Sequence, residues 1–172
     1  MNASNDPLVQ LAQATIGQYV REGKTPPPPK LPDGLPPRAG CFVSIHTEST
    51  GELRGCIGTI EATRKTLAEE VIQNAVSAST QDPRFDAVRP EELDDLSVSV
   101  DVLFPAEPAR LSDLDPKRYG VIVTKGFRRG LLLPDLEGVD TVEDQVGIAC
   151  AKAGIDPAEG FDLERFEVVR HT

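Results

Sequence analysis

Cys56 is the residue of this chain best suited to covalent chemistry, because a thiolate is a strong nucleophile. It lies between Gly55 and Gly58 in the segment Leu53–Thr59, which reads LRGCIGT. Glycines are costly in a strand unless the backbone must bulge or come close to another group, and a nearby cation such as Arg54 lowers the pKa of a thiol. The segment can hold a reactive thiol, and it also fits the more common small cysteine that fills a tight place in a core.

The direction in which Cys56 faces depends on the turn that precedes it, Ser49-Thr50-Gly51. A three-residue loop with the glycine in the left-handed conformation pairs Ser44 with Cys56 and His46 with Arg54. In that register the thiol points away from the core, beside Arg54 and diagonal to His46. These three residues would then form one catalytic group.

The other register follows from a two-residue turn at Thr50-Gly51. It would pair Cys56 with Ile45 and bury the thiol, because a shift of one residue reverses the facing of every side chain. The three-residue loop has the advantage of a coherent apolar face, which collects Val43, Ile45, Leu53 and Ile57.

A second chemically interesting segment is Asp82-Pro83-Arg84-Phe85. Asp before Pro favours a turn in which the carboxylate accepts backbone N–H groups, and Arg84 can bind a carboxylate or phosphate with two parallel hydrogen bonds. A surface turn anchored by Phe85 and an Asp82–Arg84 pair explains the same residues without a ligand. Arg128-Arg129 could also bind an anion, but it fits a solvated hairpin tip.

The remaining cysteines and histidines limit the possible metal chemistry. Cys41 and Cys150 fall at strand and helix positions with apolar neighbours, so we interpret both as structural. His46 and His171 are the only histidines, which excludes a multi-histidine metal centre by count. No metal site and no cofactor are predicted, and an odd set of three cysteines fits reduced thiols in a cytoplasm.

Composition excludes several classes of partner. The chain has 172 residues with 18 basic and 28 acidic side chains, a net charge of -10. Nucleic acids and anionic membranes both need a basic face, and no apolar run approaches the roughly 20 residues of a membrane span. The first six residues lack the basic and apolar regions of a secretion signal. We therefore expect a cytoplasmic protein that binds neither nucleic acid nor membrane.

The elements that must position these residues form one expected domain over residues 1–172. Residues 1–23 contain an N-terminal helix that ends at Gly23, and residues 24–39 form a proline-rich connector. Leu31 and Leu35 can anchor that connector to apolar surface. Residues 40–172 form the body of the domain.

The body mixes strands and helices without a regular alternation, which predicts the α+β class with an antiparallel sheet flanked by helices. In the strand expected near 96–104, alternation puts Phe104 toward the core and Asp101 toward solvent. The expected strands are 40–46, 53–60, 96–104, 119–124, 130–133 and 166–170, and the expected helices are 67–79 and 142–153.

Several segments resemble the AMMECR domain family, also called protein A of the AmmeMemoRadiSam system. The resemblance covers about residues 7 to 170, and its most specific part is LRGCIGT. The chain departs from the family pattern after Pro134, in the segment Asp135–Val139. The other similar segments are Asp82–Phe85 with Glu92-Leu93, Tyr119–Val123, Arg129–Pro134 and Cys150–Gly154.

The resemblance implies a compact α+β protein with a larger and a smaller subdomain, but no established reaction. It also implies a functional association with Memo-like and radical SAM proteins, whose genes accompany this family. One hypothesis is a thiol enzyme that acts on a small anionic or carbonyl-containing substrate. Cys56 would be its nucleophile, Arg54 would hold the anion or lower the thiol pKa, and His46 or Asp82 would move protons.

The alternative is a non-catalytic module that binds a small ligand or a partner protein. Gly55 and Gly58 would allow close approach of the ligand, and Asp82 and Arg84 would contact it. Burial and thiolate character of Cys56 discriminate between the two hypotheses.

Overall fold

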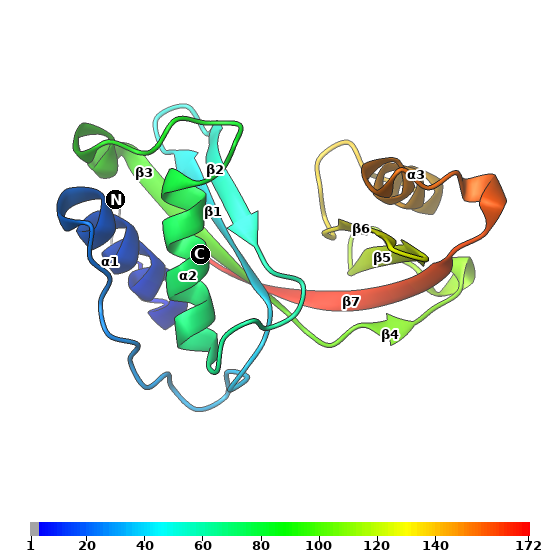
Figure 1. Cartoon of the computed structure of the whole chain (residues 1–172), viewed down its shortest axis with the longest axis horizontal. Coiled ribbons are helices and arrows are strands. Elements are labelled where there is room, and N and C mark those ends of the chain that lie inside the picture. The colour runs from blue at the N-terminus through cyan, green and yellow to red at the C-terminus, as the bar shows by residue number, and fades with distance from the viewer. Residues whose placement is uncertain (1–3) are drawn as a thin grey trace. The chain divides into compact units, whose positions relative to one another are not determined.

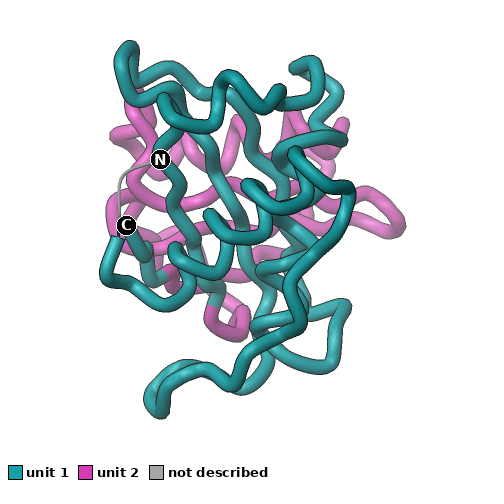
Figure 2. Tube along the Cα trace, turned by 90° about the vertical axis from the view of Figure 1, so that its left-hand side faces the viewer, with its two compact units in different colours: residues 1–103, 169–172 teal, residues 104–168 magenta. Residues whose placement is uncertain are grey.

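The computed structural model describes residues 4–172, which divide into two compact units (Figure 2). Unit 1 contains the chain up to Leu103 together with Val169–Thr172, and unit 2 contains Phe104–Val168. The chain therefore leaves unit 1 after Leu103 and returns to it at Val169. The expected α+β class, with a larger and a smaller part, is confirmed.

In the antiparallel sheet of unit 1 the strands lie in the order β2 (Leu53–Gly58), β1 (Cys41–Thr47) and β3 (Leu96–Leu103) (Figure 1). The neighbour of β3 on its other side is β7 (Asp162–His171), whose residues 169–171 belong to unit 1. Alternate residues of β1 and β3 are buried on one face, as expected for an antiparallel sheet with one face packed on a core.

Two helices pack on the buried face of this sheet (Figure 1). Helix α1 (Pro7–Glu22) starts at Asp6, whose side chain accepts two backbone N–H groups, and ends at Gly23 in the left-handed conformation. Helix α2 (Leu67–Thr80) starts with a capping box between Thr66 and Glu69. Both caps satisfy N–H groups that the first helical turn leaves free.

The proline-rich connector lies against unit 1. Leu31 and Leu35 are partly buried and pack on the apolar core, which confirms their expected role as anchors. Arg38, near the end of the connector, donates hydrogen bonds to the carbonyls of Ala62 and Arg64.

In unit 2, β7 (Asp162–His171) pairs with β4 (Glu107–Pro108) and with β5 (Tyr119–Lys125), and β5 pairs with β6 (Arg128–Leu132). Helix α3 (Val142–Ala153) packs on β5 and β6. Its buried side chains join a separate apolar core. Short 3-10 helices span Pro90–Asp95 in unit 1, and Leu111–Asp113 and Pro157–Glu159 in unit 2.

Four expectations about these strands are wrong. The β5–β6 hairpin has a two-residue turn at Gly126-Phe127, and β7 begins four residues before the expected position 166. Asp101 is 2% exposed rather than solvated, because it forms an ion pair with Arg170. Phe104 is 42% exposed, because it lies beyond the end of β3.

Candidate functional site

The thiol of Cys56 lies on the outer face of the unit 1 sheet, opposite the helices. Cys56 pairs with Ser44 across the β1–β2 hairpin, and Ser44 pairs with Ser99 of β3. The alternative pairing with Ile45 is therefore excluded, and Gly51 adopts the expected left-handed conformation with φ 73°.

The register differs from expectation near the turn. His46 pairs with Leu53 rather than with Arg54, and Arg54 is the extra residue of a β-bulge. The loop is one residue longer than expected, since Thr47 N–H donates to the Glu52 carbonyl, and the bulge restores the register at Gly55. Leu53 consequently turns to the outer face and is 36% exposed instead of buried.

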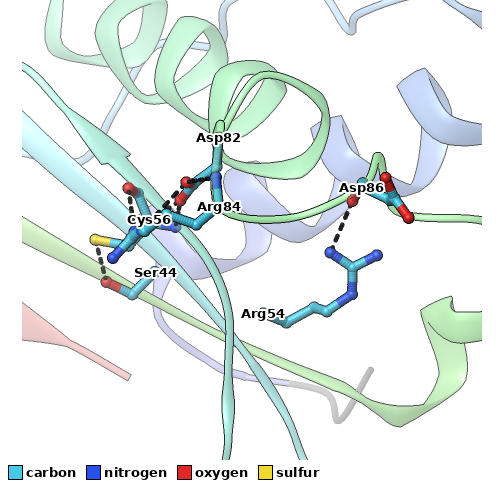
Figure 3. Close-up of polar contacts among 6 residues, drawn as sticks. All are labelled: Ser44, Arg54, Cys56, Asp82, Arg84 and Asp86. Atoms are coloured by element: carbon cyan, nitrogen blue, oxygen red, sulfur yellow. Dashed lines mark hydrogen bonds and ion pairs between the residues drawn. The ribbon is translucent and has the colours of Figure 1, made fainter.

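Cys56 is partly exposed, and its sulfur, its N–H group and its carbonyl each have a hydrogen-bond partner (Figure 3). The Ser44 hydroxyl donates to Sγ at 3.3 Å. The Cys56 N–H donates to Asp82 at 2.9 Å, and its carbonyl accepts from Arg84 at 3.3 Å. The outer face thus presents a sulfur atom next to a hydroxyl donor.

The other two cysteines have no such access. Cys41 and Cys150 are both 0% exposed, and burial raises the pKa of the Cys41 thiol to about 12. Burial also raises the pKa of Cys150. The structural interpretation of both residues is confirmed, which leaves Cys56 as the accessible thiol.

Asp82 fastens the turn after α2 to strand β2. Its carboxylate is nearly buried and accepts from the Cys56 N–H, the Arg84 N–H and the Arg84 guanidinium, the last at 2.7 Å. The hydrogen bond from Arg84 holds the pKa of Asp82 far below its usual range, against the effect of burial. Asp82 raises the pKa of Arg84 in return, with a smaller contribution from Cys56.

Arg54 points away from the thiol (Figure 3). Its guanidinium pairs with both oxygens of Glu92, at 2.8 and 3.2 Å, and donates to the Asp86 carbonyl. The hydrogen bond from Arg54 lowers the pKa of Glu92. The guanidinium groups of Arg54 and Arg84 lie 6.0 and 5.4 Å from the centre of the Phe85 ring. Because Arg84 donates to the Cys56 carbonyl and Arg54 does not contact Cys56, the cation beside Cys56 is Arg84.

The glycines of LRGCIGT lie where neighbouring groups leave no room for a side chain. A Cβ atom on Gly55 would overlap the Ala78 carbonyl of α2, and one on Gly58 would overlap the Phe42 ring. The N–H between them, on Cys56, is already bound to Asp82. Close packing therefore accounts for both glycines, and the Cys56 N–H is not free to bind a ligand.

His46 shares the outer face with Ser44 and Cys56, two residues further along β1. It lines a hollow of about 670 Å³ together with Ser97 and Ser99. The structure thus brings Cys56, Asp82 and Arg84 into direct contact. Arg54 is bound instead to Glu92 and the Asp86 carbonyl, and His46 lines the hollow beside the β1–β3 pair.

Sequence reasoning placed Ser44 opposite Cys56 without giving it a role, and it missed Glu92 as the partner of Arg54. Glu92 gave no signal, since its contact with Arg54 joins positions 38 apart in the chain. Among residues 4–172, no group of three or more His, Cys, Asp or Glu side chains is placed to hold a metal ion.

The described part of the chain has no helix that is both long and apolar enough to cross a lipid bilayer. This finding agrees with the charge and the hydropathy pattern of the sequence.

The chain is similar to a protein family, to several relatives and to a solved structure. Residues 9–171 match the AMMECR1 family model. A protein from Thermotoga maritima is 55% identical over 170 residues, covering 96% of this chain and 97% of the relative. Protein CA_C1420 from Clostridium acetobutylicum is 47% identical, but the match covers 36% of its length. The crystal structure of the uncharacterized protein PH0010 from Pyrococcus horikoshii matches 95% of this chain and 88% of its own, with a TM-score of 0.85 and 34% identity.

Proposed function

This chain belongs to the AMMECR1 family, a family of unknown activity, and from its site we propose that it is a thiol-dependent enzyme with Cys56 as nucleophile. The observation that carries the proposal is that Cys56 is a partly exposed residue whose sulfur accepts a hydrogen bond from Ser44. A structural cysteine needs neither exposure nor a hydroxyl donor, as the two buried cysteines of the chain illustrate.

Two neighbouring groups of Cys56, Ser44 and Arg84, are of the kind that a thiol nucleophile uses. A hydroxyl that donates to sulfur stabilises a thiolate, and the positive charge of Arg84 acts in the same direction. Arg84 is 54% exposed on its side chain while Asp82 holds it in place. It can therefore bind the negative group of a substrate without leaving the site.

We propose a small anionic, carbonyl-containing molecule as the substrate class. The thiolate of Cys56 adds to the carbonyl carbon, and a sulfur–carbon bond forms as the carbonyl electron pair moves onto oxygen. That oxygen then takes a proton, for which His46 on the same face is the proposed donor. Asp82 and Arg54 act as positioning residues, the first for Arg84 and the second for the Phe85 ring.

The second candidate function is a non-catalytic module that works with Memo-like and radical SAM proteins. It is favoured by the structural partners that Gly55, Gly58, Arg54 and Asp82 already have. The Clostridium acetobutylicum relative supports it too, because most of that protein lies outside the matched region. In this case Cys56 and Arg84 contact a ligand or partner without forming a bond to it.

Iodoacetamide labelling of the native protein tests the role of the thiol. We expect Cys56 to be alkylated at least about tenfold faster than Cys41 or Cys150. Arg84→Ala should slow alkylation of Cys56, because it removes the neighbouring positive charge that stabilises a thiolate. Mass-spectrometric mapping of the labelled cysteines over time measures both effects.

Arg54→Ala is the matched control for Arg84→Ala, since its guanidinium faces Glu92 instead of the thiol. It should leave the alkylation rate of Cys56 unchanged. Slow alkylation of Cys56 in the native wild type would count against the enzyme and leave the binding module as the better hypothesis.

Ser44→Ala addresses the hydroxyl separately. Loss of one hydrogen bond to the thiolate, worth about 1 kcal/mol, should slow alkylation of Cys56 about fivefold. Ser99→Ala, the next hydroxyl in the same row, serves as control. Equal alkylation rates in wild type and Ser44→Ala would show that the hydroxyl does not stabilise the thiolate.

A further inference from the structure

Unit 1 carries a second site of a different kind, an open groove of about 990 Å³ on its helical side. The end of α1, the proline-rich connector and the exposed side of α2 form its walls. This volume lies within the range of small-molecule sites. The lining residues used below are Tyr19, Pro26, Arg38, Arg64, Lys65 and Ile72.

One end of the groove is positively charged. Arg38, Arg64 and Lys65 all line it, and within residues 4–172 none of the three forms an ion pair with a carboxylate. By contrast, the arginines of the thiol site are each paired with an acidic side chain. Glu69 also lines the groove, but its carboxylate accepts hydrogen bonds from the backbone N–H groups of Lys65 and Thr66. The three cations therefore form a local cluster of positive charge in a chain with a net charge of -10.

The backbone that carries these cations is fixed. Glu70 is 0% exposed and accepts four hydrogen bonds, including those from the N–H groups of Thr63 and Arg64. Burial alone would raise the pKa of Glu70, but these hydrogen bonds lower it below its usual range. Arg38 holds the same loop from the connector side through the carbonyls of Ala62 and Arg64. A ligand would therefore meet a charged end that needs little ordering on binding.

The rest of the groove is less polar. Tyr19 and Ile72 are half-buried and Val76 is 7% exposed, so the wall of α1 and α2 offers an aromatic ring and two aliphatic side chains. Pro26 and Pro28 of the connector form the opposite wall. An apolar body can lie between these walls while a negative group reaches the cations.

We propose that this groove binds a small anionic amphiphile, meaning a carboxylate, sulfonate or phosphate attached to an aromatic or aliphatic body. The charged end supplies the electrostatic attraction and the apolar walls supply burial. Inorganic anions lack the apolar part, and neutral amphiphiles lack the charge. The proposal is independent of the chemistry at Cys56, since no residue of the thiol site lines the groove.

The probe for this site is 1-anilinonaphthalene-8-sulfonate, an anionic aromatic dye that fluoresces when it leaves water. We expect saturable binding to the native full chain, with displacement by laurate but not by inorganic phosphate or decanol. The double variant Arg64→Glu/Lys65→Glu should weaken dye binding about tenfold or more, because attraction becomes repulsion. Tyr19→Ser should weaken it through loss of apolar contact.

Arg110→Glu/Lys117→Glu is the control, since it makes the same charge change at two residues of unit 2 that do not line the groove. It should bind the dye as wild type does, and thermal unfolding monitored by circular dichroism verifies that each variant is folded. Unchanged affinity in Arg64→Glu/Lys65→Glu would overturn the proposal, as would displacement of the dye by phosphate alone. Cys56→Ser should leave dye binding intact, so failure of either proposal can be recognised separately.

Discussion

Gly55→Ala should destabilise unit 1 by about 4 kcal/mol, because the added methyl group would overlap a backbone atom that cannot turn aside. The carbonyl of Ala78 belongs to α2, so relief of the overlap would require the helix to move away from β2. Urea unfolding followed by circular dichroism measures the loss. A Gly55→Ala variant that is only partly folded at room temperature, before urea is added, would show the same loss of stability.

Gly147→Ala provides the comparison for this prediction. Gly147 lies within α3 with open space around its position, so alanine should stabilise the helix by up to about 1 kcal/mol. If both variants unfolded at the same urea concentration as wild type, the close approach of α2 to β2 would be wrong. A Gly55 variant that loses activity would therefore show a loss of folding stability and not a catalytic role for Gly55.

Asp82→Ala should cost about 2 to 3 kcal/mol of folding stability, the second largest effect expected. Most of this loss arises because the N–H groups of Cys56 and Arg84 lose their acceptor. The ion pair adds less, since Arg84 is half exposed and solvent screens it. Asp86→Ala is the matched control, because its exposed side chain can go while its backbone carbonyl still binds Arg54.

The pH dependence gives Asp82 a separate signature. Its folded pKa is lowered, so its contribution is fully present above the unfolded value of about 3.9 and is lost as pH falls through the folded pKa. Wild type should therefore lose stability more steeply than Asp82→Ala below about pH 4. Urea midpoints measured from pH 7 to pH 3 test this, and parallel curves would mean that Asp82 is not selectively stabilised as a carboxylate.

Local rules predicted the facing of Cys56. Strand alternation and the glycine of the turn suffice to place Ser44 opposite the thiol. The same rules failed at Arg54, because the bulge there depends on a longer loop and on Glu92, which follows much later in the chain. A cation next to a thiol in sequence is thus not a cation next to it in space.

Contacts between the two ends of the chain in unit 1 cannot be predicted from local sequence patterns. No pattern in the sequence indicates a role for His171, yet its Nδ1 lies 2.7 Å from a carboxylate oxygen of Asp6, the residue that caps α1. Asp101 fits an ordinary alternation until Arg170 is brought beside it. Such pairs join residues that share no helix or strand period, so no spacing rule can reveal them.

The return of Val169–Thr172 to unit 1 has a consequence for synthesis of the chain on the ribosome. The first hundred residues emerge long before Arg170, so nascent unit 1 lacks the end of β7, the strand next to β3, and the guanidinium that pairs with Asp101. Until those residues are made, β3 has an unpaired edge, and such an edge can pair with other chains. The sheet of unit 1 is therefore completed only after unit 2 has been translated, and its β3 edge needs protection until then.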